Sequence, residues 1–188
     1  MFSTSITFKA GKLIELAFAT LIEGKETQFY EQYFPKVQPI ASELGGQVLR
    51  TYEVTESCSK LDDLKMGGFF QWESIEAFTK LHNKAEFLAI KPLRDDALKF
   101  FINGLFYTVA QDTTVMLEDG ESYALIAHLD VFDCCVTSSL LDLTSVVESN
   151  KTEYSPVRIQ LFKWNECCDK ILQEGKADIF KIKFNTPQ

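Results

Sequence analysis

The sequence predicts an α+β protein made of one strand–helix–strand–strand–helix–strand unit and a second, abbreviated unit of the same kind. Three observations lead to this prediction: an apolar run near the N-terminus, amphipathic stretches between short strand-like segments, and a weak repetition of the first part of the chain in the last. The 188 residues are 46% hydrophobic, which suffices for a core and excludes disorder as a description of the whole chain.

The first unit opens with residues 13–22 (LIELAFATLI), an apolar run that is too short to span a bilayer and is typical of a central strand covered on both faces. A helical stretch follows and stops at Gly45-Gly46. Its apolar residues recur at spacings of three and four: Phe29, Tyr33, Val37, Ile40 and Leu44. Pro35 and Pro39 lie inside it, so we expect a kink or two shorter helices.

Two strands, 47–54 and 66–72, come next. Ser74 is a suitable N-cap for the following helix. Pro92 suits the first turn of a further helix, which we expect to run to about residue 101 and to close at Asn103-Gly104 before a fourth strand at 105–110. This element order is the split βαβ of a ferredoxin-like unit.

The second unit begins after an acidic turn at residues 118–121. We expect strands at 123–132, 157–164 and 178–184, with a short helix at 140–147 and a longer one at 165–174. The predicted organisation is therefore a ferredoxin-like domain at residues 1–117 and an abbreviated second ferredoxin-like half at residues 118–188.

Parts of the second unit repeat parts of the first. At an offset of 92, Phe70 and Trp72 match Phe162 and Trp164, and residues 84–91 match 176–183; at an offset of 108, residues 19–21 fall on 127–129. Internal duplication explains this pattern, and chance similarity of two F-x-W strand endings is the alternative. Because a ferredoxin-like sheet normally covers its open apolar face with a second sheet, the partner is either a second copy in a homodimer or the tethered second half in an intrachain pseudo-dimer.

A family resemblance rests on residues 72–94 (WESIEAFTKLHNKAEFLAIKPLR). Ser74, Glu76 and Ala77 and then the segment 86–94, which ends in K-P-L-R, resemble the small dimeric α/β-barrel proteins catalogued as domain of unknown function 1330. The W-E-S-x-E-A-F stretch is also similar to antibiotic-biosynthesis-type monooxygenases of the same superfamily. The resemblance covers residues 13–112, with Lys84-Ala85 in place of the usual Ser-Pro. It implies a barrel lumen that holds a small apolar or aromatic compound.

Six residues are the candidate site residues. In the strand at 123–132, His128 and Asp130 share the face of Ile126, which we expect to point to the interior between the sheets, where the pair could act as a catalytic base. The candidate ligand-binding residues are Arg50, Tyr52, Trp72 and His82. Each has a structural alternative, such as an ion pair for Arg50 and core packing for Trp72. Arg94, beside Asp95 and Asp96, is interpreted as part of a solvated helix surface.

Several classes of function are excluded or disfavoured. The formal charge is -8 and no basic stripe exists, which argues against nucleic-acid binding. No apolar run is long enough to span a membrane and we see no secretory signal, so we expect a cytoplasmic protein. The five cysteines and two histidines form no zinc pattern, and we expect no metal and no cofactor. Haem ligation would rest on His82 alone and is not expected.

Two hypotheses about function remain. In the first, the protein binds a small apolar or aromatic molecule in the barrel lumen, and its enzymatic form is a cofactor-free monooxygenase or isomerase. In the second, it is a non-catalytic dimerisation or interaction module whose barrel is filled. The two differ in whether a cavity exists and in which side chains face it.

Overall fold

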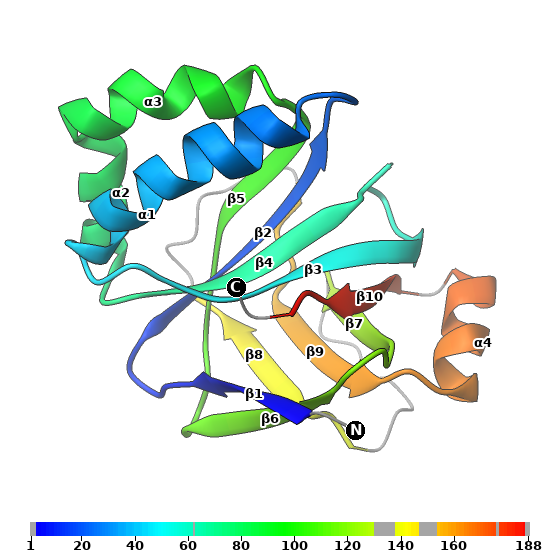
Figure 1. The fold of residues 1–188 in the computed structure, drawn as a ribbon. Coiled ribbons are helices and arrows are strands. Elements are labelled where there is room, and N and C mark those ends of the chain that lie inside the picture. Colours follow the sequence, from blue (N-terminus) through cyan, green and yellow to red (C-terminus); the bar gives the residue numbers. More distant parts are fainter. Residues whose placement is uncertain (1–2, 62, 130–137, 147–153, 176, 187–188) are drawn as a thin grey trace.

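The computed structural model describes residues 3–61, 63–129, 138–146, 154–175 and 177–186. Within these ranges the chain forms a closed, antiparallel, eight-stranded barrel with a helical layer on one side (Figure 1). The barrel strands are β2 (Leu13–Leu21), β3 (Gln47–Cys58), β4 (Met66–Trp72), β5 (Leu98–Thr108), β7 (Tyr123–His128), β8 (Leu141–Ser145), β9 (Arg158–Lys163) and β10 (Asp178–Phe184). The helical elements are the π-helical segment η1 (Gln28–Tyr33), α1 (Phe34–Ser42), α2 (Ile75–Asn83), α3 (Ala85–Asp95) and α4 (Glu166–Glu174). The predicted α+β class is confirmed.

The barrel consists of two sets of four strands with one shared order. The first set runs β5-β2-β4-β3 and the second runs β10-β7-β9-β8, so in each set the neighbours are the fourth, first, third and second strand along the chain. The sets join where β3 pairs with β10 and where β5 pairs with β8. One chain therefore closes the barrel by itself.

The barrel interior is a packed core. Alternate residues of each strand point inward, and the following interior side chains are each at most 1% exposed: Ile14, Leu16, Phe18, Tyr52, Phe69, Leu105, Tyr107, Leu125, Leu161 and Phe180. Phe18 lies 5.0 Å from Phe180, measured between ring centroids, which shows how rings from opposite sets meet. The prediction that a ligand binds in the barrel lumen is therefore wrong, because aromatic and aliphatic side chains fill that space.

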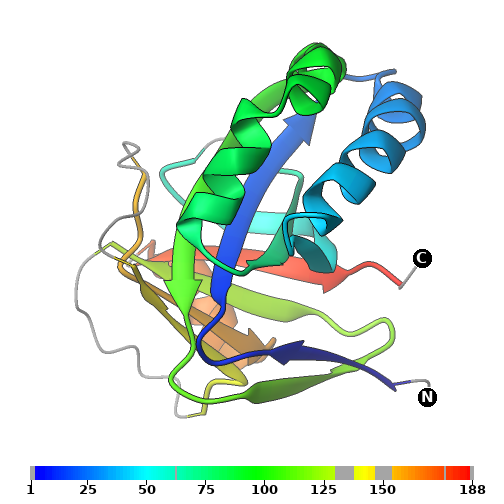
Figure 2. The same ribbon diagram turned by 90° about the vertical axis from the view of Figure 1, so that its left-hand side faces the viewer.

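A two-stranded ribbon lies against the barrel on the side away from α1, α2 and α3 (Figure 2). It pairs β1 (Ser3–Phe8) with β6 (Thr113–Glu118) and was not predicted from the sequence. Ile6, Phe8 and Val115 of the ribbon join the barrel core, and the Phe8 ring meets that of Phe69 edge-on at 5.5 Å. The ribbon thus extends the hydrophobic core beyond the barrel itself.

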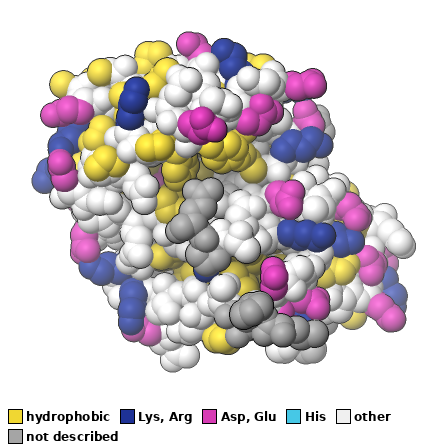
Figure 3. Space-filling view, in the orientation of Figure 1, with side chains coloured by type: hydrophobic (Ala, Val, Ile, Leu, Met, Phe, Trp, Pro, Cys, Tyr) yellow, Lys and Arg dark blue, Asp and Glu magenta, His cyan; other side chains and the backbone are white. Residues whose placement is uncertain are grey.

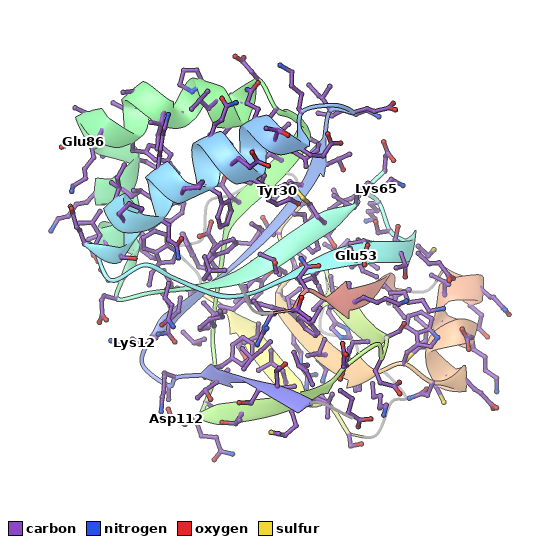
Figure 4. The ribbon with its side chains drawn as sticks, viewed as in Figure 1. Lys12, Tyr30, Glu53, Lys65, Glu86 and Asp112 are labelled. Carbon is purple, nitrogen blue, oxygen red and sulfur yellow. The ribbon has the colours of Figure 1, made fainter. Side chains whose placement is uncertain are left out.

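The helical layer, which consists of η1, α1, α2 and α3, covers the outer face of the first strand set. Ser74 caps α2, as predicted, and its hydroxyl accepts a hydrogen bond from the backbone N–H of Ala77. The first helical stretch is not divided into two separate helices at its prolines: η1 continues directly into α1 with helical backbone angles at Tyr33 and Phe34, and Pro39 lies inside α1. Two contacts tie η1 to its surroundings: the Gln28 side chain donates to the Leu93 carbonyl at 2.8 Å, and the Tyr30 hydroxyl donates to Met66 Sδ at 3.2 Å (Figure 4).

Among the described residues, no helix is long and apolar enough to cross a membrane.

Two predicted helices are wrong. Residues 98–104 belong to β5 and not to a helix, because Phe100 and Ile102 pack toward the barrel while Phe101 points to the other side, which is the period of a strand. Pro92 lies inside α3 near its end. Residues 141–145 form strand β8, whose alternating Leu141 and Leu143 face the core.

Candidate functional site

A cavity of about 330 Å³ lies between the helical layer and the outer face of the first strand set. Figure 3 shows hydrophobic side chains gathered along this boundary. Eight of its lining residues are aromatic and come from both the helices and the sheet: Phe29, Tyr33, Phe34, Phe70, Trp72, Phe78, Phe87 and Phe101. Its size is at the lower end of the range for pockets that bind small molecules.

Glu15 lies on the sheet side of this pocket. On β2 the even-numbered residues Ile14 and Leu16 face the barrel core, so the side chain of Glu15 points outward, beneath the helices. It is only 5% exposed. Its Oε2 accepts a hydrogen bond of 2.8 Å from Nε1 of Trp72, and its Oε1 accepts one of 3.0 Å from the backbone N–H of Gly104.

The second donor exists because β5 contains a bulge. Leu16 pairs with Leu105 and Phe18 with Ile102, so Asn103 and Gly104 form an irregularity in the β2–β5 ladder. Gly104 has φ +73°, the left-handed conformation that glycine adopts without strain. The bulge turns the N–H of Gly104 toward Glu15. The Asn103-Gly104 pair, which we expected to end a helix, thus positions a donor in the pocket.

Glu15 is an ionisable group poised near neutral pH. Burial raises the pKa of its carboxyl from the ordinary value of 4.5 to about 7, against the opposing effects of the Gly104 and Trp72 hydrogen bonds and the charge of Arg94. At pH 7 both protonation states are therefore populated. A carboxylate with such a pKa can take up a proton from a bound molecule and release it again.

Arg94 is the cation of the pocket. Its Nε and Nη2 donate to Oδ1 of Asp95 at 2.9 and 2.7 Å, and its guanidinium lies 4.8 Å from the ring centroid of Phe101. Burial raises the pKa of the nearby Tyr33 hydroxyl, and the positive charge of Arg94 acts against that rise. The residue is 8% exposed, so its interpretation as a solvated surface residue is wrong. In the K-P-L-R segment, the side chain of Arg94 points inward, where its guanidinium packs against the rings of Phe87 and Phe101.

His82 and Trp72, both predicted as ligand-binding residues, line this pocket. Nδ1 of His82 lies 3.0 Å from the carbonyl oxygen of Phe78, one turn earlier in α2. Burial lowers the pKa of His82 below its ordinary 6.5, and the charges of Arg94 and Lys91 act in the same direction. The imidazole is therefore mostly neutral at pH 7. Two of the six predicted residues thus lie together, although in a different place from the expected lumen.

Arg50 and Tyr52 lie elsewhere. They share one face of β3, as expected, but Tyr52 is part of the barrel core and Arg50 donates to the carbonyl oxygen of Asn185 at 3.3 Å. Neither lines the pocket that contains Glu15. In the structure they connect the first strand set to the C-terminal residues of the chain.

His128 lies on the outer face of the second strand set, opposite to the predicted face. Its neighbour Ile126 packs with Cys168 of α4, while Leu125 points into the barrel. Nε2 of His128 is 3.0 Å from Oε1 of Gln160. The strand alternates as predicted, but all six of its residues are buried, so the pattern did not reveal which face is inside. Asp130 lies outside the described residues.

Sequence reasoning missed Glu15, Arg94 and Tyr33. The available signal for Glu15 was a single charged residue inside the apolar run LIELAFATLI, because a buried carboxylate in a strand requires hydrogen-bond partners. For Arg94 and Tyr33 the local sequence gives no comparable signal, since both lie in helices with mixed surfaces. Among the described residues, no group of His, Cys, Asp and Glu could hold a metal ion.

Comparisons with known proteins show the fold. No family model and no curated protein matches the chain. Among solved structures, an anthrone oxidase-like protein is similar to it, with 12% identity and a TM-score of 0.55 over 97% of this chain and 96% of that one. A mutant chlorite dismutase from Candidatus Nitrospira defluvii has 7% identity and a TM-score of 0.43, over 93% of this chain and 92% of that chain. The first likeness shows that the chain shares the overall fold of that protein, and the ferredoxin-like βαββαβ arrangement of each half stays a prediction. The chain's place in the family catalogued as domain of unknown function 1330 stays a prediction.

Proposed function

We propose that the pocket between the helical layer and the first strand set binds a small aromatic molecule and that Glu15 takes a proton from it. The observation that carries the proposal is the placement of one buried carboxylate, with two N–H donors, in the wall of a cavity rich in aromatic side chains. A core residue would not need a cavity beside it. A ligand site needs this combination of apolar walls and few polar groups.

The walls favour a flat, apolar ligand. The rings of Trp72 and Phe78 meet edge-on at 5.5 Å, and Phe78 meets Phe106 in the same way at 4.9 Å, so the aromatic surface is rigid. A planar ring system would gain dispersion contacts with several of these faces at once. The similarity in fold to an anthrone oxidase-like protein supports an aromatic ketone as the first compound to test.

Opposite charges on two sides of the pocket suit proton transfer. In an aromatic ketone such as anthrone, the C–H bonds next to the ring system and conjugated with the carbonyl are acidic. Glu15 in its ionised form would accept that proton, and the enolate left behind would carry negative charge that the Arg94 guanidinium attracts. Return of the proton to another carbon gives an isomerase.

The oxygenase form of the proposal adds molecular oxygen as co-substrate. The enolate would give electrons to O₂, so that the CH₂ group becomes C=O and the second oxygen atom leaves as water. The chain's own residues then only remove the proton, orient the enolate and exclude bulk water. This is the cofactor-free monooxygenase chemistry expected from the sequence, moved from the lumen to the outer face of the sheet.

Proton exchange on anthrone tests the proposal. Under argon in D₂O at pH 8, we expect the wild-type protein to accelerate hydrogen–deuterium exchange at the CH₂ group, followed by NMR. Glu15→Gln keeps the shape and should lose about a hundredfold or more of this acceleration. Glu23→Gln, an exposed position, is the matched control. Equal acceleration by Glu15→Gln would contradict the assignment of the base.

Binding is measured separately, because the chain has two tryptophans and one lines the pocket. In Trp164→Phe the fluorescence comes from Trp72 alone, and anthrone should quench it. Quenching without exchange would favour the alternative, a non-catalytic binding or interaction module, which the filled barrel interior also supports. Absence of both would contradict the aromatic site.

The proposal also states which sheet covers the first strand set: the second half of the same chain. Pairing of β3 with β10 and of β5 with β8 within one chain supports the intrachain pseudo-dimer over the homodimer. Light scattering coupled to size-exclusion chromatography tests it: a mass near 21.4 kDa agrees with the pseudo-dimer, and twice that mass supports a homodimer.

A further inference from the structure

The imidazole of His82 has one tautomer fixed by its helix. Nδ1 lies 3.0 Å from the carbonyl oxygen of Phe78, and a carbonyl oxygen only accepts hydrogen bonds. Nδ1 therefore carries the proton and donates it. In the neutral ring, Nε2 is then a lone-pair acceptor and not a donor.

The ring of His82 packs beside two aromatic rings. Its centroid lies 4.2 Å from that of Phe78 and 4.9 Å from that of Phe87, and the ring lines the pocket that contains Glu15. Nε2 lies on the part of the ring away from the Phe78 carbonyl. His82 lines the pocket and, among the described residues, no hydrogen bond of Nε2 is found, so this atom is available as an acceptor for a bound molecule.

Glu15 and Arg94, which also line the pocket, have other roles in the proposal. Each oxygen of Glu15 already accepts one N–H bond, and the side chain is the proposed base. Arg94 has only donors. The positive charges of Arg94 and Lys91 near His82 also disfavour a second proton on its ring. A neutral acceptor in an aromatic wall selects ligands that bring a donor, because a ligand without one leaves the acceptor desolvated and unpaired.

We propose that Nε2 of His82 accepts a hydrogen bond from a hydroxyl group of the ligand, so that the pocket selects hydroxylated aromatic compounds. This inference rests on the proposed function, because it assigns a ligand group to the same pocket. It adds a specificity-determining residue and narrows the ligand class from aromatic to phenolic compounds.

A matched pair of probes separates the hydroxyl from the ring system: 2-naphthol and 2-methylnaphthalene have similar shapes, and only the first has a donor. Dissociation constants come from Trp72 fluorescence in the Trp164→Phe protein. We expect His82→Phe, which keeps an aromatic ring between Phe78 and Phe87, to reduce the preference for 2-naphthol about tenfold relative to the unmodified histidine. Lys80→Ala, exposed on the same helix, should leave the preference unchanged.

Nitrogen NMR on the protein with labelled histidine gives a test without any substitution at the site. The Nε2 resonance of His82 should move on addition of 2-naphthol and stay in place with 2-methylnaphthalene, whereas the resonances of His128 should not respond. Two equal responses of His82, or an unchanged preference in His82→Phe, would overturn the inference while leaving the aromatic pocket intact. Failure of both probes to bind would instead contradict the proposed function.

Discussion

The indole of Trp72 donates a hydrogen bond of 2.8 Å to the carboxylate of Glu15, and both side chains are almost completely buried. The two residues come from neighbouring strands, since β4 pairs with β2. Tryptophan normally satisfies its N–H when buried, and here the partner is a group with a pKa near 7. The pair joins the aromatic wall of the pocket to its proposed base.

Removing the indole donor should raise the pKa of Glu15 further. Trp72→Phe keeps a ring but deletes an N–H that stabilises the ionised carboxylate, so the pKa should rise by about 1. The midpoint of the pH dependence of anthrone exchange should then move to higher pH. Trp164→Phe is the control, because the indole of Trp164 donates to Asp169 of α4, which packs against the other strand set. An unchanged midpoint in Trp72→Phe would show that this hydrogen bond does not tune Glu15.

Glu15 should also shape the pH dependence of stability. Its pKa is higher in the folded protein, about 7, than the ordinary 4.5, so the folded state binds the proton more tightly. This stabilisation is complete below about pH 4.5 and disappears as the pH rises to about 7. The total is on the order of 3 kcal/mol.

Urea unfolding of wild type and Glu15→Gln at several pH values measures this effect. The free energy of unfolding of the wild type, minus that of the variant, should fall between pH 4.5 and 7 and level off above. Taking the difference removes the contribution of His82, whose lowered pKa has the opposite sign. A difference that is constant with pH would contradict the raised pKa of Glu15.

A residue larger than glycine at position 46 should displace the indole of Trp72. A Cβ atom at Gly46 would lie 2.5 Å from Cζ3 of the indole and 2.7 Å from its Cη2, so the ring would have to move. We expect Gly46→Ala to cost about 1–3 kcal/mol of stability, to change the fluorescence of Trp72 and to weaken anthrone binding. Gly120→Ala, where no atom lies within 4 Å, should leave the fluorescence as it is. Identical spectra for Gly46→Ala and wild type would refute the predicted contact.

A substitution in the barrel interior should reduce the stability of the protein and leave its affinity for anthrone unchanged. Leu161 is fully buried there, and Leu161→Ala should reduce the free energy of unfolding by about 2–5 kcal/mol. Its affinity for anthrone, measured at a temperature where the variant is folded, should equal that of the wild type. A stable variant with altered affinity would return the ligand to the lumen.

Much of the fold could be predicted because local chemistry decides it. The strands at 66–72 and 178–184 follow from alternation, and the Ser74 cap follows from capping chemistry. The failures occur where tertiary contacts override a local signal. Asn103-Gly104 resembles a helix end, but opposite β2 it becomes a bulge that serves Glu15.

The sequence matches behind the predicted repeat differ in how they map onto the structure. Phe70 and Trp72 share the outer face of the first set as Phe162 and Trp164 share that of the second, in agreement with the offset of 92. The same offset matches helix α3 with strand β10, and the offset of 108 places the interior Phe18 on the outward-facing Ile126. Duplication stays a prediction, which the shared strand order favours more than the sequence matches do.

The site could be predicted only in part, because it is made of residues distant in sequence. Trp72 and His82 were recognised as aromatic and titratable side chains near the resembling motif. Glu15, which accepts a hydrogen bond from Trp72, precedes both by more than fifty positions and lies in a strand whose sequence is typical of the core. Closure of the barrel decides which face of each strand points outward. Where both faces of a strand are buried, its hydrophobic pattern does not show which face that is.

The pH profile of anthrone exchange, measured side by side for wild type and Glu15→Gln, tests the central claim most directly. The account predicts that the wild-type rate rises with pH around a midpoint near 7, as Glu15 ionises, and that Glu15→Gln shows only the profile of buffer without protein. The same rising profile in Glu15→Gln would contradict the claim that Glu15 is the base.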